Sequence, residues 1–104
     1  MVQAVSSVRS LEEVKLELQA LKPLLKKRFK VETIDIFGSF AREMQTEKSD
    51  LDILVTYSGM VSLFTIYDLK QFLKRRLRMK VDVVSKEFLN KYIKDQVLKE
   101  AVAV

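Results

Sequence analysis

Apolar residues recur at spacings of three and four in three stretches of the chain, which is the pattern of amphipathic helices. The first stretch begins with "SLEE", in which Ser10 and Glu13 match a helix capping box. Pro23 is expected to kink or split this first helix. Its apolar positions are Leu11, Val14, Leu18, Leu21 and Leu25.

The other two stretches predict a helix in the second half of the chain and another at its end. Residues 62–78 are apolar at Ile66, Leu69, Leu73 and Leu77 and basic over the remaining surface. The segment "KEFLNKYIKDQVLKEAV" (86–102) predicts a last helix. Its expected buried stripe consists of Phe88, Tyr92, Ile93, Val97 and Ala101.

Three short segments between these stretches alternate apolar and polar residues, as strands do. They are "VETIDIF" (31–37), "DLDILVT" (50–56), which precedes a turn at Gly59, and "KVDVVS" (80–85). A short helix is expected after Gly38. The alternation of helices and strands predicts an α/β fold, a small mixed β-sheet of about three strands flanked by helices.

Composition limits both the size and the location of the protein. With 104 residues, 48% of them hydrophobic, the chain can form one core, so a single domain over residues 1–104 is expected. Residues 1–10 do not resemble a signal peptide, and no apolar run approaches the roughly 20 residues that cross a bilayer. A soluble cytoplasmic protein is therefore expected, with no membrane partner.

Charge and residue usage narrow the chemistry. Cys and His are both absent, which excludes disulfides, thiolate or imidazole metal sites and Ser-His or Cys-His nucleophiles. Any metal must therefore be held by oxygen. The formal net charge of +5 suits an anionic partner, but small basic proteins commonly carry such charge for solubility, so it is weak evidence.

Two acidic residues interrupt the second predicted strand at alternate positions. Asp50 and Asp52 should therefore point to one face, with Cα atoms roughly 6.5–7 Å apart. Burial of Leu51 and Ile53 on the other face would fix this register. Because fixed paired anions repel unless a cation joins them, the pair predicts a hard divalent ion such as Mg²⁺ and a phosphate-bearing ligand.

Two further features extend this candidate site. Asp82 lies between valines on the third predicted strand and could complete a three-carboxylate cluster. Gly38 and Ser39 follow the first strand, where a helix N-terminus would aim backbone N–H groups at an anion. Each feature alone is usually a solvated strand face or an ordinary turn, but their order and spacing favour a joint site. Asp35 is taken as solvent-facing and outside the site.

The segment from Gly38 to Asp52 resembles the signature of the polymerase-β nucleotidyltransferase superfamily. It contains Gly38-Ser39, ten intervening residues and then Asp50-Leu51-Asp52. In particular, the chain resembles a minimal nucleotidyltransferase (MNT-type) domain over nearly its whole length. The resemblance implies that Gly38 and Ser39 bind the triphosphate of ATP and that Asp50 and Asp52 ligate catalytic Mg²⁺. Asp82 would be the third carboxylate of the metal site.

The loop after the Gly-Ser pair matches the family less closely. Arg42 corresponds to a basic residue that often follows the pair, and it could meet phosphate or be a surface arginine. The family's usual Arg-Gly-Glu is here Arg42-Glu43-Met44, without the Gly that loosens this loop.

By resemblance, the chain would be a Mg²⁺-dependent nucleotidyltransferase and antitoxin that transfers AMP from ATP to a tyrosine of a HEPN-type ribonuclease toxin. An inactive subunit that blocks its partner sterically is the alternative. A third interpretation is a nucleic-acid-binding domain that uses Lys70, Lys74, Arg75, Arg76 and Arg78. Since charge supports it only weakly, direct nucleic-acid binding is not expected. The sequence leaves open the acceptor, the nucleotide preference and whether a homo-oligomer forms.

Overall fold

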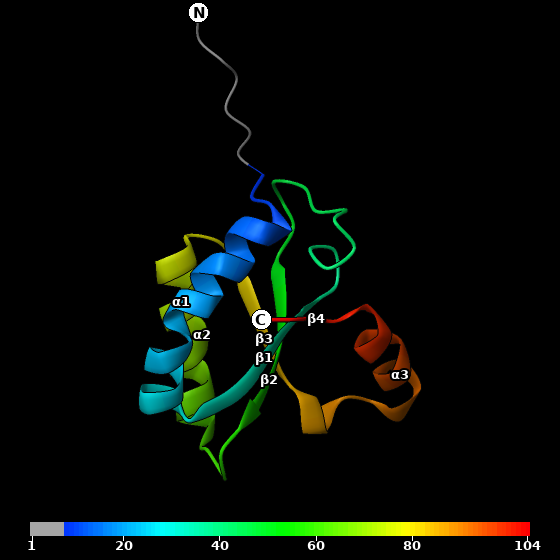
Figure 1. The fold of residues 1–104 in the computed structure, drawn as a ribbon. Helices are drawn as coiled ribbons and strands as arrows, with labels where there is room; N and C mark the ends of the chain where they lie inside the picture. Colours follow the sequence, from blue (N-terminus) through cyan, green and yellow to red (C-terminus); the bar gives the residue numbers. More distant parts are fainter. Residues whose placement is uncertain (1–7) are drawn as a thin grey trace, which may run out of the picture.

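The computed structural model describes residues 8–104, which form a four-stranded mixed sheet with helices on both faces (Figure 1). A single domain over residues 1–104 was expected, and residues 1–7 of it lie outside the described residues. In chain order the elements are α1 (Leu11–Phe29), β1 (Val31–Phe37), β2 (Leu51–Tyr57), α2 (Leu63–Leu77), β3 (Val81–Ser85), a 3-10 helix (Lys86–Phe88), α3 (Lys91–Glu100) and β4 (Val102–Ala103).

The sheet has the strand order β3-β2-β1-β4. β1 is antiparallel to both β2 and β4, whereas β2 and β3 are parallel. The predicted α/β class with a mixed sheet is therefore confirmed, but the sheet has four strands rather than about three. The additional strand, β4, consists of two residues, which is too short for an alternating pattern to reveal.

The two long helices begin and end at local capping signals. The Ser10 hydroxyl accepts a hydrogen bond from the Glu13 N–H at 3.0 Å, as the capping box predicts for the start of α1. Pro23 lies inside α1 without splitting it. The Ser62 hydroxyl caps α2 in the same way, by accepting from the Thr65 N–H at 3.3 Å. The helix predicted over residues 62–78 is confirmed, because its two end residues are the caps of α2.

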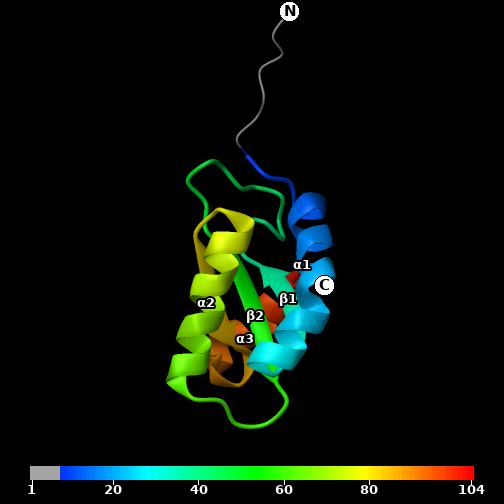
Figure 2. The same ribbon diagram turned by 90° about the vertical axis from the view of Figure 1, so that its left-hand side faces the viewer.

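The core lies between one face of the sheet and the helices α1 and α2, which run side by side in opposite directions (Figure 2). Leu18 and Leu25 of α1 and Leu69 and Leu73 of α2 have no exposed surface. On the strands the buried residues on this face include Ile34, Ile36, Leu51, Ile53, Val55 and Val81. Burial of the alternate residues of β2 fixes its register and turns Asp52 toward the opposite face.

α3 lies on the opposite side of the sheet from α1 and α2 (Figure 1). The stripe predicted to be buried there is wrong for Phe88, Tyr92 and Ile93, which are 79%, 91% and 51% exposed. Residues 86–102 also form no single helix, because Leu89 and Asn90 are extended and the Asn90 side chain caps a new helix at the Tyr92 N–H. The apolar period thus indicated the face of the helix but not whether anything covers it. Within the described residues, no helix is long and apolar enough to cross a membrane.

Candidate active site

Asp52 and Asp82 lie side by side on the sheet face that α1 and α2 leave uncovered. They are paired in the parallel register of β2 and β3. Residues in register on neighbouring strands point to the same face, and their Cα atoms are separated by about one strand spacing, ~4.8 Å. Asp52 is half-buried and Asp82 is exposed. The fold therefore places two carboxylates together where they meet solvent.

Asp50 lies one residue before β2 and is exposed. Its charge reaches Asp52, whose pKa is raised above the ordinary aspartate value, first by burial and then by the negative charges of Asp82 and Asp50. The positive charge of Arg42 acts in the opposite direction. Burial and the two neighbouring charges both disfavour the ionised Asp52 carboxylate, whereas a cation bound beside it would favour the ionised form.

β1 ends at Phe37, and the next residue, Gly38, lies directly against the Asp52 carboxylate. Its φ is +73°, a backbone conformation that side chains disfavour. A Cβ at this position would lie 2.3 Å from Asp52 Oδ2 and 3.1 Å from Asp52 Cγ. Since Phe37 is the register partner of Asp52, the chain turns immediately beside the carboxylate. The backbone at Gly38 therefore lies directly against the Asp52 carboxylate, which only a residue without a side chain permits.

The short helix predicted after Gly38 is wrong, since residues 38–43 form turns. The Arg42 N–H donates to the Gly38 carbonyl at 3.2 Å and the Met44 N–H to the Ser39 carbonyl at 2.9 Å. Glu43 then adopts a left-handed backbone with φ 55°, which ends the helical path. Ser39 consequently lies in a tight turn beside Asp52 and not at the N-terminus of a helix.

Arg42 forms an ion pair with Glu100, at the end of α3, at an Nη1–Oε2 distance of 3.0 Å. The other Glu100 oxygen accepts from Gln96 Nε2 at 3.3 Å. Arg42 is thus held above the sheet face on the side of Asp52, the position in which it could also meet a phosphate. Sequence reasoning missed Glu100, which is 58 residues from Arg42 and carries no periodic signal.

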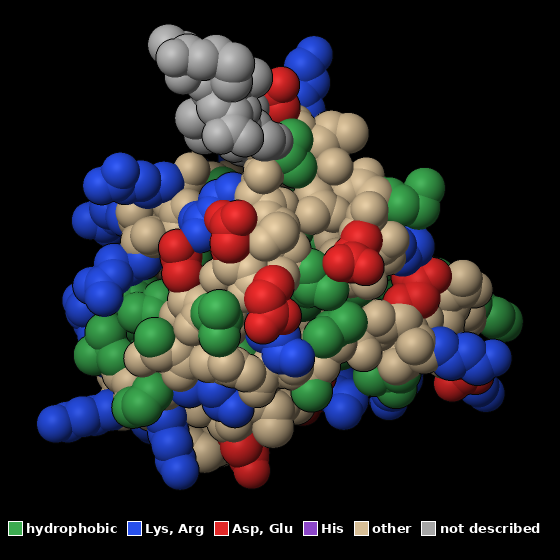
Figure 3. Space-filling model, turned by 45° about the horizontal axis from the view of Figure 1, so that its top comes forward, with side chains coloured by type: hydrophobic (Ala, Val, Ile, Leu, Met, Phe, Trp, Pro, Cys, Tyr) green, Lys and Arg blue, Asp and Glu red, His purple; other side chains and the backbone are tan. Residues whose placement is uncertain are grey.

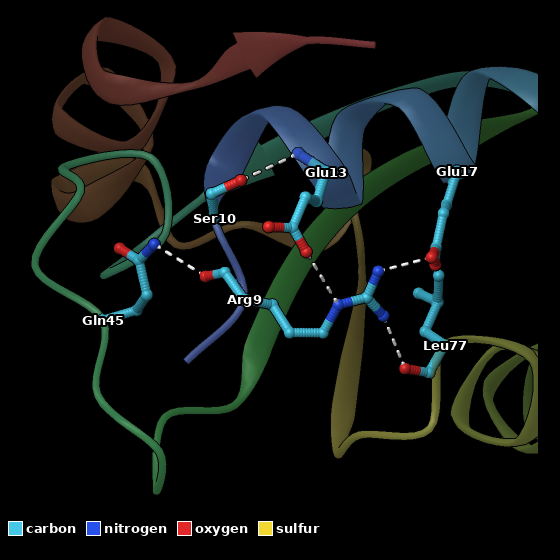
Figure 4. A network of polar contacts seen from close by, with 6 residues as sticks. All are labelled: Arg9, Ser10, Glu13, Glu17, Gln45 and Leu77. Atoms are coloured by element: carbon cyan, nitrogen blue, oxygen red, sulfur yellow. Dashed lines mark hydrogen bonds and ion pairs between the residues drawn. The ribbon is translucent and has the colours of Figure 1, made fainter. Parts of the chain in front are cut away.

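A second group of polar contacts, centred on Arg9, anchors the loop between β1 and β2 (Figure 4). Arg9 Nη1 donates to the Leu77 carbonyl at 2.8 Å, and its guanidinium pairs with Glu17 and, at 3.7 Å, with Glu13. The Arg9 carbonyl accepts from Gln45 Nε2 at 2.9 Å. The loop that leads into Asp50 is therefore tied to the start of α1 and the end of α2. No pattern in the sequence indicated this anchor.

The donor set of the site meets part of what Mg²⁺ requires. Figure 3 shows one face of the molecule, on which acidic side chains are scattered among hydrophobic, Lys and Arg side chains. Within residues 8–104, no group of three or more acidic side chains is arranged so that it could hold a metal ion as it stands. Mg²⁺ nevertheless commonly uses one or two carboxylates, with water and substrate phosphates completing its shell. The hard oxygen donors of Asp52 and Asp82 match this coordination preference of Mg²⁺.

Comparison with known proteins gives consistent matches. The family model described as "Polymerase beta, Nucleotidyltransferase" matches residues 19–104. The protein adenylyltransferase MntA of Thermococcus cleftensis is 40% identical over 95 residues, which cover 91% of this chain and 96% of that protein.

Solved structures agree in fold. A structure provisionally described as a minimal nucleotidyltransferase is 33% identical with a TM-score of 0.79, and the match covers 92% of this chain and 97% of that one. A toxin-antitoxin complex with AMP-PNP contains a chain that is 27% identical with a TM-score of 0.70, covering 84% of this chain and 70% of that one.

Proposed function

Since this chain belongs to the polymerase beta nucleotidyltransferase family, we propose that it is an antitoxin that transfers AMP from ATP to a tyrosine hydroxyl of a HEPN-type ribonuclease toxin. The observation that carries the proposal is the carboxylate pair Asp52 and Asp82 beside the tight turn at Gly38. The name of the Thermococcus relative supports adenylyl transfer to protein, and the AMP-PNP complex supports ATP and a toxin partner. The HEPN class and the tyrosine follow from the resemblance to MNT-type domains.

The turn would bind the nucleotide phosphates. Gly38 leaves room for an anion to approach the backbone, and the Ser39 hydroxyl is a donor in the same turn. Arg42 lies nearby and can offer a charge-assisted hydrogen bond once its pairing with Glu100 yields to phosphate.

The carboxylates would serve the metal and the acceptor. Asp52 and Asp82 would hold Mg²⁺, with Asp50 as a third negative charge nearby. When bound, the ion would supply positive charge for the phosphate oxygens and lower the pKa of a bound hydroxyl. Asp82 is exposed, so it can accept the proton of the acceptor hydroxyl. The tyrosine oxygen forms a bond to the α-phosphorus, the bond from that phosphorus to the bridging oxygen breaks, and pyrophosphate leaves.

The test is incubation of the protein with its partner toxin, ATP and Mg²⁺, followed by intact-protein mass spectrometry of the toxin. We expect a gain of AMP mass that Asp52→Asn abolishes. Asp35→Asn is the matched control. Asp35 lies on the same face of the sheet as Asp52, but it pairs with Leu54 and Ala103, away from the turn. If the wild type adds no AMP to its authentic partner under these conditions, adenylyl transfer is refuted.

A non-enzymatic antitoxin that blocks its partner sterically is the second candidate. It is favoured by the uncovered apolar side chains of Phe88, Tyr92 and Ile93, since such patches commonly mark protein interfaces. The missing loop glycine does not favour this candidate, because Glu43 at that position adopts a left-handed backbone, φ 55°, which glycine would adopt readily. This candidate predicts that Asp50→Asn/Asp52→Asn still neutralises the toxin in a growth assay, whereas adenylyl transfer predicts that it does not.

A further inference from the structure

A cleft of about 280 Å³ opens beside the carboxylates, between α2 and the start of β3. Its charged lining is Asp50, Asp82, Lys70, Lys74 and Lys80. Lys70 and Lys74 are one helical turn apart, so both project from one side of α2, and both are half-buried. The cleft therefore carries three ammonium groups against two carboxylates.

These lysines are held in no close ion pair. Among the described residues, ion pairs within 4.0 Å join only Arg9 to Glu13 and Glu17, and Arg42 to Glu100. With three lysines against two aspartates, the cleft has a net positive charge, which attracts an anion. None of the three lysines is needed for the nucleotide-binding turn proposed above.

The position of the cleft indicates that the anion belongs to the acceptor and not to the nucleotide. In the sheet, the Gly38 turn lies at the end of β1, Asp52 on the central β2 and Asp82 on β3. In an in-line displacement the attacking oxygen and the leaving group lie on opposite sides of the phosphorus. With the nucleotide phosphates at the β1 side, the acceptor enters from the β3 side, where the lysines are.

β3 also offers backbone groups to an extended chain. It is a terminal strand of the sheet, so among the described residues no strand pairs with its outer edge. Such an edge can take up an extended peptide segment through main-chain hydrogen bonds. An acidic extended segment satisfies both the edge and the lysines.

We propose that this cleft docks an acidic, extended segment of the protein acceptor, next to the hydroxyl that receives AMP. The inference rests on the proposed function, because it names the substrate side of that same site. Charge complementarity of this kind fixes register and partner choice as well as contributing affinity.

The test uses a fluorescein-labelled peptide in which a tyrosine is flanked on both sides by glutamates, and a matched peptide with glutamines in their place. Binding is measured by anisotropy with Mg²⁺ and α,β-methylene-ATP present, because this analogue has a P–C bond in place of the bond that adenylyl transfer breaks. We expect the wild type to prefer the acidic peptide by about tenfold or more, which corresponds to ~1.4 kcal/mol. Lys70→Gln/Lys74→Gln should lose this preference. Lys26→Gln/Lys27→Gln, which changes the net charge equally on exposed α1 positions, should keep it.

Three outcomes would overturn the proposal. Equal loss in both double variants would show a general charge effect. Unchanged peptide binding with weakened α,β-methylene-ATP binding in Lys70→Gln/Lys74→Gln would assign the lysines to the triphosphate. Unchanged peptide binding with new self-association would show that they only guard the sheet edge, a common role of edge lysines.

The experiments can refute the docking site and the proposed reaction independently of each other. Peptide binding is measured without transfer, so a protein that shows the lysine-dependent preference but never transfers AMP refutes the reaction alone. A protein that modifies its partner at equal rates before and after Lys70→Gln/Lys74→Gln refutes the docking site alone.

Discussion

Gly38→Ala places a methyl group against the carboxylate that the proposed reaction needs most. The Cβ would lie 2.3 Å from Asp52 Oδ2, which is far inside van der Waals contact. The backbone at φ +73° is also unfavourable for alanine. The variant should therefore lose both stability and activity.

The chain contains its own reference for the backbone part of this loss. Gly59, the only other glycine, has φ +111°, and a Cβ there meets no atom within 4 Å. Gly59→Ala should cost only the strain of a non-glycine residue, about 1–3 kcal/mol. Gly38→Ala adds displacement of the Asp52 carboxylate, comparable to overpacking at about 1–3 kcal/mol, so we expect a total of about 2–6 kcal/mol.

Urea denaturation followed by circular dichroism measures both variants, and AMP transfer to the partner toxin measures activity. A carboxylate shifted by about 1 Å should lower the transfer rate about 100-fold in Gly38→Ala, whereas Gly59→Ala should transfer at the wild-type rate. The clash is isolated by repeating Gly38→Ala in an Asp52→Ala background. With Oδ2 and Cγ removed, the remaining atom, Asp52 Cβ, lies at 3.3 Å. The stability cost of Gly38→Ala should then fall close to that of strain, because the remaining contact needs only a small shift.

Equal stability losses for Gly38→Ala in the wild-type and Asp52→Ala backgrounds would show that the two residues are not coupled. Full activity of Gly38→Ala would show that the carboxylate position set by this turn does not matter for transfer. Either result would refute the reasoning.

Three further predictions concern stability. Asp52→Asn should stabilise the fold by about 0.5–1 kcal/mol at pH 7 in urea denaturation, because solvent screens this half-buried charge. The folded pKa of Asp52 is raised, so its charge destabilises the fold above that pKa, and the gain should disappear as the pH falls to the unfolded value of 3.8. Glu43→Gly should raise stability by about 0.5–1 kcal/mol, because it relieves the left-handed strain at φ 55°, and an unchanged melting temperature would contradict this. Arg9→Gln should cost about 1.5–3 kcal/mol and speed amide exchange at Gln45, since the charged contacts of Arg9 to α1 and the end of α2 are lost; unaltered exchange would refute the anchoring role.

The parts of the fold that were predictable are those set by neighbouring residues. α2 could be bounded from its apolar period and from Ser62 and Arg78, which cap it. β2 and β3 followed from alternation, and their parallel pairing brings Asp52 and Asp82 together. Periodicity and capping act within a few residues, so a single sequence carries them.

The unpredicted parts depend on contacts between distant residues. The hydrogen bonds of Arg9 to Leu77 and of Gln45 to Arg9 join residues separated by 68 and 36 positions, and polar contacts leave no period in the sequence. Phe88, Tyr92 and Ile93 were expected to be buried because an apolar stripe shows which face is apolar, not what packs on it. A turn was found where a helix was predicted after Gly38, and Glu43 in this segment has a left-handed backbone. The sequence did not indicate this conformation, because glycine and not glutamate is the usual residue at such positions.

Two aspartates on the same sheet face show what makes one position a candidate site and the other not. Asp35 was set apart because it lies opposite Ile34 and Ile36, but Asp52 lies opposite Leu51 and Ile53 in the same way. What differs is the position along the strands. Asp35 is flanked in register by Leu54 and Ala103, whereas Asp52 is flanked by Phe37, where β1 ends and the chain turns at Gly38, and by Asp82 near the start of β3. A carboxylate with a turn on one side and a second carboxylate on the other can meet both phosphate and cation, so the ends of the strands, and not the face alone, select Asp52.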